Sequence, residues 1–270
     1  MFFRMERRYA KYEGGDIFYT HSGEGPVIVL VHGYLESSEV WGRFRDKLSD
    51  RYRLICIDLP GNGQSSYYSC DFTMCFHAGA VMAVVRNENV NRFFLAGHSL
   101  GGYVALSVVE NYPESLMGYI LIHSHPFADS SEVIENRLRE IKIVEAGKQD
   151  AIYPVNVPKM FADENLGKHA DDIKELIRIA GGHSAEGIVA VLRGMIGRKS
   201  REDILSQGRI PLLYILGVKD NYIPYKLMLE KIKMPEGAIL VSLEKSGHMG
   251  FLEETDLTVR VISDFISKFI

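Results

Sequence analysis

Cysteine is scarce in this sequence, and long apolar runs and a strong excess of charge of one sign are missing. The three cysteines, Cys56, Cys70 and Cys75, are an odd number without Cys-x-x-Cys spacing, so neither a disulfide framework nor a zinc site is indicated. Residues 1–15 hold no apolar run long enough for a signal peptide or a membrane span. The formal net charge of −4 provides no basic face for nucleic acid or anionic lipid. We therefore expect a cytoplasmic protein that contacts neither nucleic acid nor a membrane.

Sequence motifs for cofactors are also missing. Gly61 and Gly63 stand in the wrong context for a dinucleotide-binding fingerprint, and no cluster of metal-ligating residue types has the spacing of a metal site. We expect neither a cofactor nor a metal. The sequence leaves the oligomeric state open.

The strongest positive signal is the segment 93–102, FFLAGHSLGG, in which an apolar run leads into Gly-His-Ser-Leu-Gly and then a helical pattern. Gly97 and Gly101 leave room where a Cβ would clash with the neighbouring strand and helix, so Ser99 can occupy a sharp strand-to-helix turn. The motif predicts that Ser99 is a nucleophile and that the N–H of Leu100 stabilises an oxyanion. A glycine-rich turn that carries a surface serine is the competing interpretation of this motif alone.

Two residues downstream supply the partners that a serine nucleophile needs. Asp220 and His248 each follow an apolar segment typical of a buried strand. Serine is a poor nucleophile at neutral pH, so we expect His248 to accept its proton and Asp220 to hold the imidazole in the right tautomer. Asp129, shortly after the sixth expected strand, is an alternative acid.

Two upstream turns complete the expected site. His32 and Gly33 follow an apolar strand, and the N–H of Tyr34 is the expected second donor to an oxyanion. We expect His32 to bond loop backbone, and we expect Asp58 to organise its own loop through backbone hydrogen bonds.

Together these motifs resemble the α/β-hydrolase superfamily over residues 15–270. The order Ser, Asp, His is that of its catalytic triad, and the segment 58–65, DLPGNGQS, is similar to the family's loop after the fourth strand. Within the superfamily the chain is similar to small, capped, cofactor-free hydrolases with a serine nucleophile. Ser99 excludes haloalkane dehalogenases and epoxide hydrolases, because those enzymes need a carboxylate at this turn.

Alternating apolar and helical segments predict an α/β fold with a mostly parallel, doubly wound sheet. A hairpin is expected over 7–23, with its turn at Gly14-Gly15. The further strands are expected at 27–31, 52–58, 93–98, 117–123, 211–217 and 238–245, and the helices of this core at 37–50, 72–88, 102–114, 223–232 and 255–270.

The interval from 126 to 208 breaks this alternation, because it is charged, rich in helical pattern and lacks a convincing buried strand. We assign residues 1–125 and 209–270 to an α/β-hydrolase core and residues 126–208 to a helical cap inserted after the sixth strand. An apolar stripe in this interval that includes Met195 and Ile196 either packs on the core or faces substrate.

Four residues are candidates for substrate binding: His125, Met160, Met195 and Ile196. Met160 shares the ambiguity of the apolar stripe. His123 and His125 end the sixth strand, where either packing or substrate contact fits.

A serine triad favours hydrolysis of a small carboxylic ester or related acyl substrate through an acyl-serine intermediate. The alternative is a carbon–carbon bond hydrolase or a lyase like the menaquinone-pathway synthase, since the motifs LRGM and HGYLESSEVW look similar to those enzymes. A ligand receptor on a hydrolase fold is a third hypothesis. In each case the expected partner is a small molecule.

Overall fold

The computed structural model describes residues 5–70 and 72–270, and eight strands of these residues form one sheet in the order β1-β2-β4-β3-β5-β6-β7-β8. The strands are β1 (Glu6–Tyr12), β2 (Gly15–Ser22), β3 (Val27–Val31), β4 (Arg53–Ile57), β5 (Phe93–His98), β6 (Leu116–Ile122), β7 (Leu212–Gly217) and β8 (Ile239–Leu243). β1 pairs antiparallel with β2, and β2 with β4, whereas all the other neighbours are parallel. The predicted α/β class with a mostly parallel sheet is confirmed.

The opening hairpin forms as predicted, but its turn lies one residue earlier. Glu13 and Gly14 both have positive φ, 44° and 82°, and Gly15 already belongs to β2. Two consecutive residues with positive φ match the twist of a two-residue hairpin turn, for which glycine is the least strained residue.

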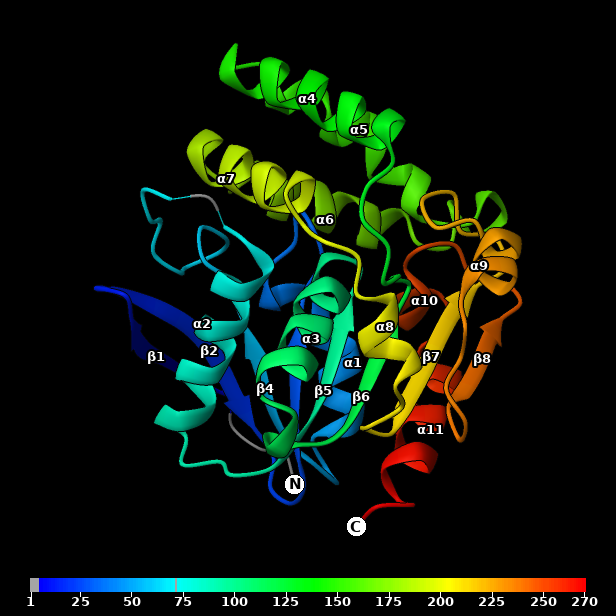
Figure 1. The fold of residues 1–270 in the computed structure, drawn as a ribbon. Coiled ribbons are helices and arrows are strands. Elements are labelled where there is room, and N and C mark those ends of the chain that lie inside the picture. The colour runs from blue at the N-terminus through cyan, green and yellow to red at the C-terminus, as the bar shows by residue number, and fades with distance from the viewer. Residues whose placement is uncertain (1–4, 71) are drawn as a thin grey trace.

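Helices cover both faces of the sheet, which explains why its central strands are apolar throughout. The helices are α1 (Gly42–Leu48), α2 (Met74–Asn87), α3 (Leu100–Asn111), α4 (Ser131–Glu145), α5 (Tyr153–Asn156), α6 (Ala170–Gly181), α7 (Ala185–Ile196), α8 (Glu202–Ser206), α9 (Tyr225–Lys231), α10 (Gly250–Glu253) and α11 (Thr255–Ile266). Short 3-10 helices are η1 (Ser38–Trp41), η2 (Pro113–Ser115), η3 (Gln149–Ala151), η4 (Pro158–Met160) and η5 (Asp163–Asn165). In Figure 1, α2, α3 and α8 stand in front of the sheet and α1 lies behind it, where it packs on α11.

The chain between β6 and β7 is described throughout, and it holds helices without a strand. Figure 1 shows α4 to α7 stacked over one end of the sheet, with the C-terminus of the chain at the other end. Two serines cap these helices: Ser130 accepts the N–H of Val133, and Ser184 accepts the N–H of Gly187.

Packing within this helical segment decides the environment of the apolar stripe on α7. α7 packs against α4, and Met195 is only 1% exposed and belongs to the main hydrophobic core. Ile196 is half-buried against the same core. Of the two interpretations of the stripe, these surroundings favour packing for Met195.

Candidate active site

The turn between β5 and α3 is the sharp turn that the sequence predicts. Ser99 has a φ of 49°, a backbone conformation that residues other than glycine rarely adopt. A Cβ at Gly97 would lie 2.2 Å from the carbonyl oxygen of Gly101, and a Cβ at Gly101 would lie 2.2 Å from that of Val31. The two glycines are therefore needed because the turn is packed between its own helix and strand β3.

The two backbone N–H groups that the sequence predicts as oxyanion donors belong to this turn and to the turn after β3. Leu100 is the first residue of α3, so its N–H has no acceptor within the helix. In the turn after β3, the N–H of Gly33 donates to Glu36 Oε2 at 2.7 Å. The next backbone donor along that turn is the N–H of Tyr34, the residue that the sequence predicts for this role.

Asp220 and His248, which follow β7 and β8, are brought together in the structure. His248 Nδ1 lies 2.8 Å from Asp220 Oδ2, and both side chains are buried. Asp220 Oδ1 accepts the N–H groups of Tyr222 at 2.8 Å and of Ile223 at 2.9 Å. The carboxylate is thus fixed by backbone on one oxygen and by imidazole on the other.

Burial and charge act in opposite directions on this pair. Burial on its own would raise the pKa of Asp220, but the neighbouring His248 and His123 hold that pKa well below its ordinary value. Burial would lower the pKa of His248, but the charge of Asp220 and its hydrogen bond outweigh burial and raise it. The resulting pair suits an imidazole that must carry positive charge during a reaction.

His98, the residue before Ser99, connects the turns of the site. Its Nε2 donates to the carbonyl oxygen of His248 at 2.9 Å, and its Nδ1 lies 3.0 Å from Glu36 Oε2. His98 therefore links the end of β5, next to Ser99, to the loop that carries His248. Among the described residues no hydrogen bond joins Ser99 Oγ to the His248 ring. Their pairing therefore stays a prediction. Catalytic hydrogen bonds of this kind are often long in the absence of substrate.

The loop that carries His248 is also held by the helical segment. The N–H of His248 donates to the carbonyl oxygen of Met160 at 2.6 Å. Glu253 accepts the N–H of Gly247 at 2.8 Å and that of Ala162 at 2.9 Å. Met160 thus contacts the candidate base through its backbone carbonyl.

The remaining candidates have other partners. His125 Nε2 lies 3.2 Å from the Tyr103 hydroxyl, and its Nδ1 accepts the N–H of Phe127 at 3.2 Å. Burial lowers the pKa of His125 to about 3, so the ring is neutral. Asp129, the alternative acid, is paired with Arg137 at 2.8 Å and with Arg198 at 2.7 Å, and it has no bond to His248.

Comparisons with known proteins identify the family of the chain. A family model for the alpha/beta hydrolase fold matches residues 26–166. The chain belongs to the α/β-hydrolase fold family. A pimeloyl-[acyl-carrier protein] methyl ester esterase of Aeromonas hydrophila is 27% identical over 254 residues, which cover 90% of this chain and 96% of that relative. A solved thermophilic esterase from Thermogutta terrifontis, with malate bound, matches with a TM-score of 0.92 and 25% identity, over 98% of this chain and 99% of that one.

Another relative of this α/β hydrolase has a different activity in its name. The dihydrolipoyllysine-residue acetyltransferase component of an acetoin cleaving system from Cupriavidus necator is 27% identical over 256 residues. The match covers 92% of this chain but only 66% of that relative's length. Taken together, the relatives show that this α/β hydrolase is an esterase-like enzyme.

None of the helices in residues 5–70 and 72–270 has the length and apolar character needed to cross a membrane.

Several polar residues of the hydrolase site were not assigned their roles from the sequence: Glu36, His123, Glu140, Tyr222 and Glu253. Glu140 of α4 accepts the Tyr34 hydroxyl at 2.9 Å, and the ring of Tyr222 lies 5.4 Å from that of His248. Glu36 stands in the HGYLE motif, so its nearness to the oxyanion turn was a usable signal. The sequence gives no signal for the roles of Glu253 and Glu140, because their partners are distant in the chain.

The ligand atoms of His123, Asp220 and His248 lie within 4.8 Å of one another, a set of residue types that can bind a divalent metal. Short contacts already pair the facing nitrogen and oxygen atoms of this set. The expectation that the hydrolase needs no metal stays a prediction.

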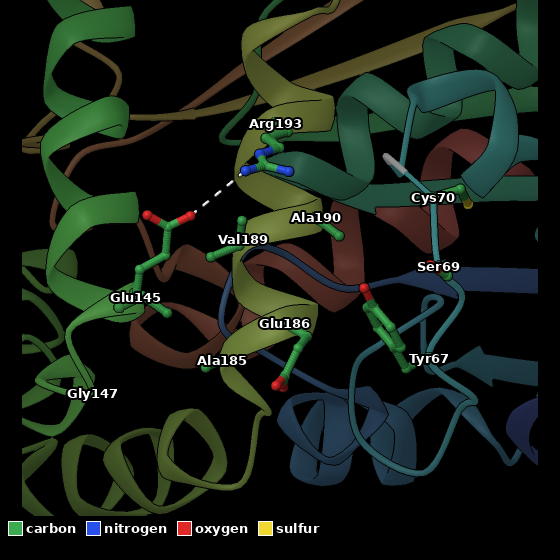
Figure 2. Close-up of a pocket in the computed structure, with 11 residues that line it drawn as sticks. Tyr67, Ser69, Cys70, Glu145, Gly147, Ala185, Glu186, Val189, Ala190 and Arg193 are labelled. Carbon is green, nitrogen blue, oxygen red and sulfur yellow. Dashed lines mark ion pairs between the residues drawn. The ribbon is translucent and has the colours of Figure 1, made fainter.

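A cavity of about 750 Å³ lies away from these residues, between α4, α7 and the loop that precedes α2 (Figure 2). Its lining includes Tyr67, Glu186 and an ion pair between Arg193 and Glu145 at 3.6 Å, but none of Ser99, Asp220 and His248. The cavity is therefore separate from the hydrogen-bonded residues at the carboxyl ends of the strands.

Proposed function

We propose that this α/β hydrolase cleaves a small carboxylic ester through an acyl-serine intermediate, with Ser99, His248 and Asp220 as its catalytic triad. The observation that carries the proposal is the 2.8 Å contact between His248 Nδ1 and Asp220 Oδ2 at the same edge of the sheet as the strained Ser99 turn. Nδ1–H bound to a carboxylate leaves Nε2 free to act as a base.

The reaction follows from the atoms at this edge. His248 Nε2 accepts the hydroxyl proton as Ser99 Oγ attacks the ester carbonyl, and the N–H groups of Leu100 and Tyr34 stabilise the oxyanion. His248 then returns the proton to the departing alcohol, which leaves an acyl-serine. A water molecule, activated by the same imidazole, releases the carboxylic acid and regenerates Ser99.

The helical segment 126–208 acts as a cap over this edge, which its position in Figure 1 supports. His125, Met160 and Ile196 are kept as candidate contacts to the small acyl substrate, and Met195 is assigned to packing in the hydrophobic core. An ester substrate agrees with the activities named for two of the similar proteins. A cytoplasmic location is part of the proposal, on the ground of the cysteine pattern.

Removal of the nucleophile tests the proposal. Ser99→Ala should leave the protein folded and reduce turnover of a short-chain aryl ester by about 10⁶-fold. An organophosphonate should label the peptide that contains Ser99, and this labelling should persist in Ser107→Ala, a control at a buried serine on α3. More than a tenth of the wild-type rate in Ser99→Ala, or labelling elsewhere, would refute the assignment.

A further inference from the structure

His123 immediately follows β6 and occupies a slot built for its ring. Its side chain is fully buried, and its φ of 47° is in the left-handed region that only a few residue types adopt easily. A Cβ at Gly250 would lie 2.4 Å from His123 Nε2, and one at Gly217 would lie 2.9 Å from its Cε1. Glycine at both positions therefore makes room for an imidazole at this place.

The partners of the ring fix its proton. Nδ1 lies 3.3 Å from Asp220 Oδ2 and 3.1 Å from the N–H of Gly217, and Nε2 lies 3.1 Å from the N–H of Gly250. With the proton on Nε2, the ring would turn a donor toward Gly250 and a lone pair toward the carboxylate, two repulsive contacts. With the proton on Nδ1, the ring faces the Asp220 carboxylate with a donor and accepts from Gly250, and only the N–H of Gly217, which points at the same Nδ1, is in a repulsive contact. The Nδ1–H tautomer is therefore favoured.

We propose that His123 is a positioning residue that donates its Nδ1–H to Asp220 Oδ2 beside His248 and so limits how strongly Asp220 holds the charged form of His248. The inference rests on the proposed triad. It makes Asp220 an acceptor of four donors, two imidazoles on Oδ2 and two backbone N–H groups on Oδ1. A carboxylate bound in this way can neither rotate nor concentrate its charge on one imidazole.

The titratable neighbours agree with a neutral His123. Burial lowers its pKa to about 4 against the opposing effect of Asp220. The rings of His248 and His98 lie 5.8 Å and 6.1 Å away, and Glu36 and Glu253 are further charges that act on His248. Since His123 is uncharged, its influence on His248 passes through the 3.3 Å contact between its Nδ1 and Asp220 Oδ2.

The first test is made on the wild-type protein and needs no turnover. Nitrogen-15 NMR of the histidine rings should show His123 as the neutral Nδ1–H tautomer from pH 6 to pH 8. The ring is neutral in this range because even pH 6 lies about two units above its pKa. An Nε2–H tautomer, or an imidazolium in this range, would overturn the proposal whether or not any variant folds.

The second test compares two substitutions at this position. His123→Ala removes the donor, so the midpoint of His248 titration should rise by about 0.5 to 1 pH unit, and kcat should fall by about tenfold with KM nearly unchanged. His123→Asn should restore most of both values, because the amide Nδ2 stands where Nδ1 stood and asparagine tolerates positive φ. An alanine variant with an unmoved midpoint, or an asparagine variant that behaves like alanine, would refute the role.

His77 provides the matched control. It is fully buried on α2, its ring nitrogens have no hydrogen-bond partner, and burial lowers its pKa to about 3. His77→Ala and His77→Asn should alter stability without moving the titration midpoint of His248. Because the midpoint is read by NMR, it still reports on His123 if Ser99→Ala shows that the proposed hydrolysis is wrong.

Discussion

Asp220 and Asp129 are both buried and follow neighbouring strands of the sheet, but their partners differ in kind. Asp220 accepts from the His248 ring and from two backbone N–H groups. Asp129 is held by the guanidinium groups of Arg137 and Arg198. An imidazole gains and loses a proton near neutral pH, whereas arginine stays charged. Of the two carboxylates, only Asp220 is therefore placed to assist proton transfer.

The surroundings of Asp129 indicate a different use for a buried carboxylate. Its two arginines come from α4 and from the residues after α7, and the Arg198 guanidinium also lies 4.0 Å from the centre of the Tyr103 ring on α3. Asp129 thus joins two parts of the helical segment to the end of β6. Burial alone therefore does not identify a catalytic acid, because the chemistry of the partner decides.

Neutralising Asp220 should have a larger effect on activity than neutralising Asp129. Asp220→Asn should lower kcat by about 10⁴-fold with the fold retained, because the amide no longer holds His248 in the right tautomer or stabilises its charge. Steady-state kinetics on a short-chain aryl ester measures the loss. A decrease of less than tenfold would mean that another group orients His248.

The same change at Asp129 should affect stability and leave the chemistry intact. Asp129→Asn leaves the buried Arg198 and the partly buried Arg137 without a full counter-charge, so the free energy of unfolding should fall by about 3 to 5 kcal/mol. Urea denaturation measures it, and kcat of the folded variant should stay within about threefold of the wild-type value. A loss of kcat comparable to that of Asp220→Asn would remove the distinction between the two aspartates.

Met195 extends the comparison from charge to packing. Met195→Ala should lower the free energy of unfolding by about 2 to 5 kcal/mol, because a core side chain that is 1% exposed leaves a cavity. The ranking of ester substrates by acyl chain length should not change. Ile196→Ala, at a half-buried position on the same helix, should lose less stability but change the ranking, because Ile196 is a candidate substrate contact. A changed ranking in Met195→Ala would show instead that this side chain contacts substrate.

The pH dependence of activity sharpens the comparison further. The base must be neutral, so kcat/KM should fall as the pH drops through the pKa of His248, which Asp220 raises above its ordinary value of 6.5. In the residual activity of Asp220→Asn, this midpoint should move to lower pH by about 1 unit or more. Asp129→Asn should leave it in place. A midpoint that moved in both variants would indicate that the two carboxylates act on the same imidazole.

Much of the fold and part of the site could be predicted because their causes are local in the sequence. The turn at Ser99 requires glycine two residues away on each side, and the hairpin requires a residue with positive φ between two strands. Asp58 accepts the N–H of Gln64 in its own loop, as predicted. It also accepts the N–H of Ser38, and His32 accepts that of Leu59, both from loops distant in the sequence.

Other features depend on contacts between distant segments, and the sequence does not display them. The partners of His123 come from β7 and α10, and Glu253 joins the His248 loop to Ala162. The side of α7 that carries Met195 could not be assigned, because its helical spacing fits a core face and a substrate face equally well. The folded chain buries that side chain in the main hydrophobic core.

The strained backbone at Ser99 means that stability and reactivity place opposite demands on this position. A residue with a side chain in this conformation costs about 1 to 3 kcal/mol, and glycine would relieve that strain. Substitution of Ser99 by glycine would therefore stabilise the fold and at the same time remove the hydroxyl. A lineage that keeps serine here tolerates a less stable fold, and a thermal-stability screen of this protein would tend to select inactive descendants.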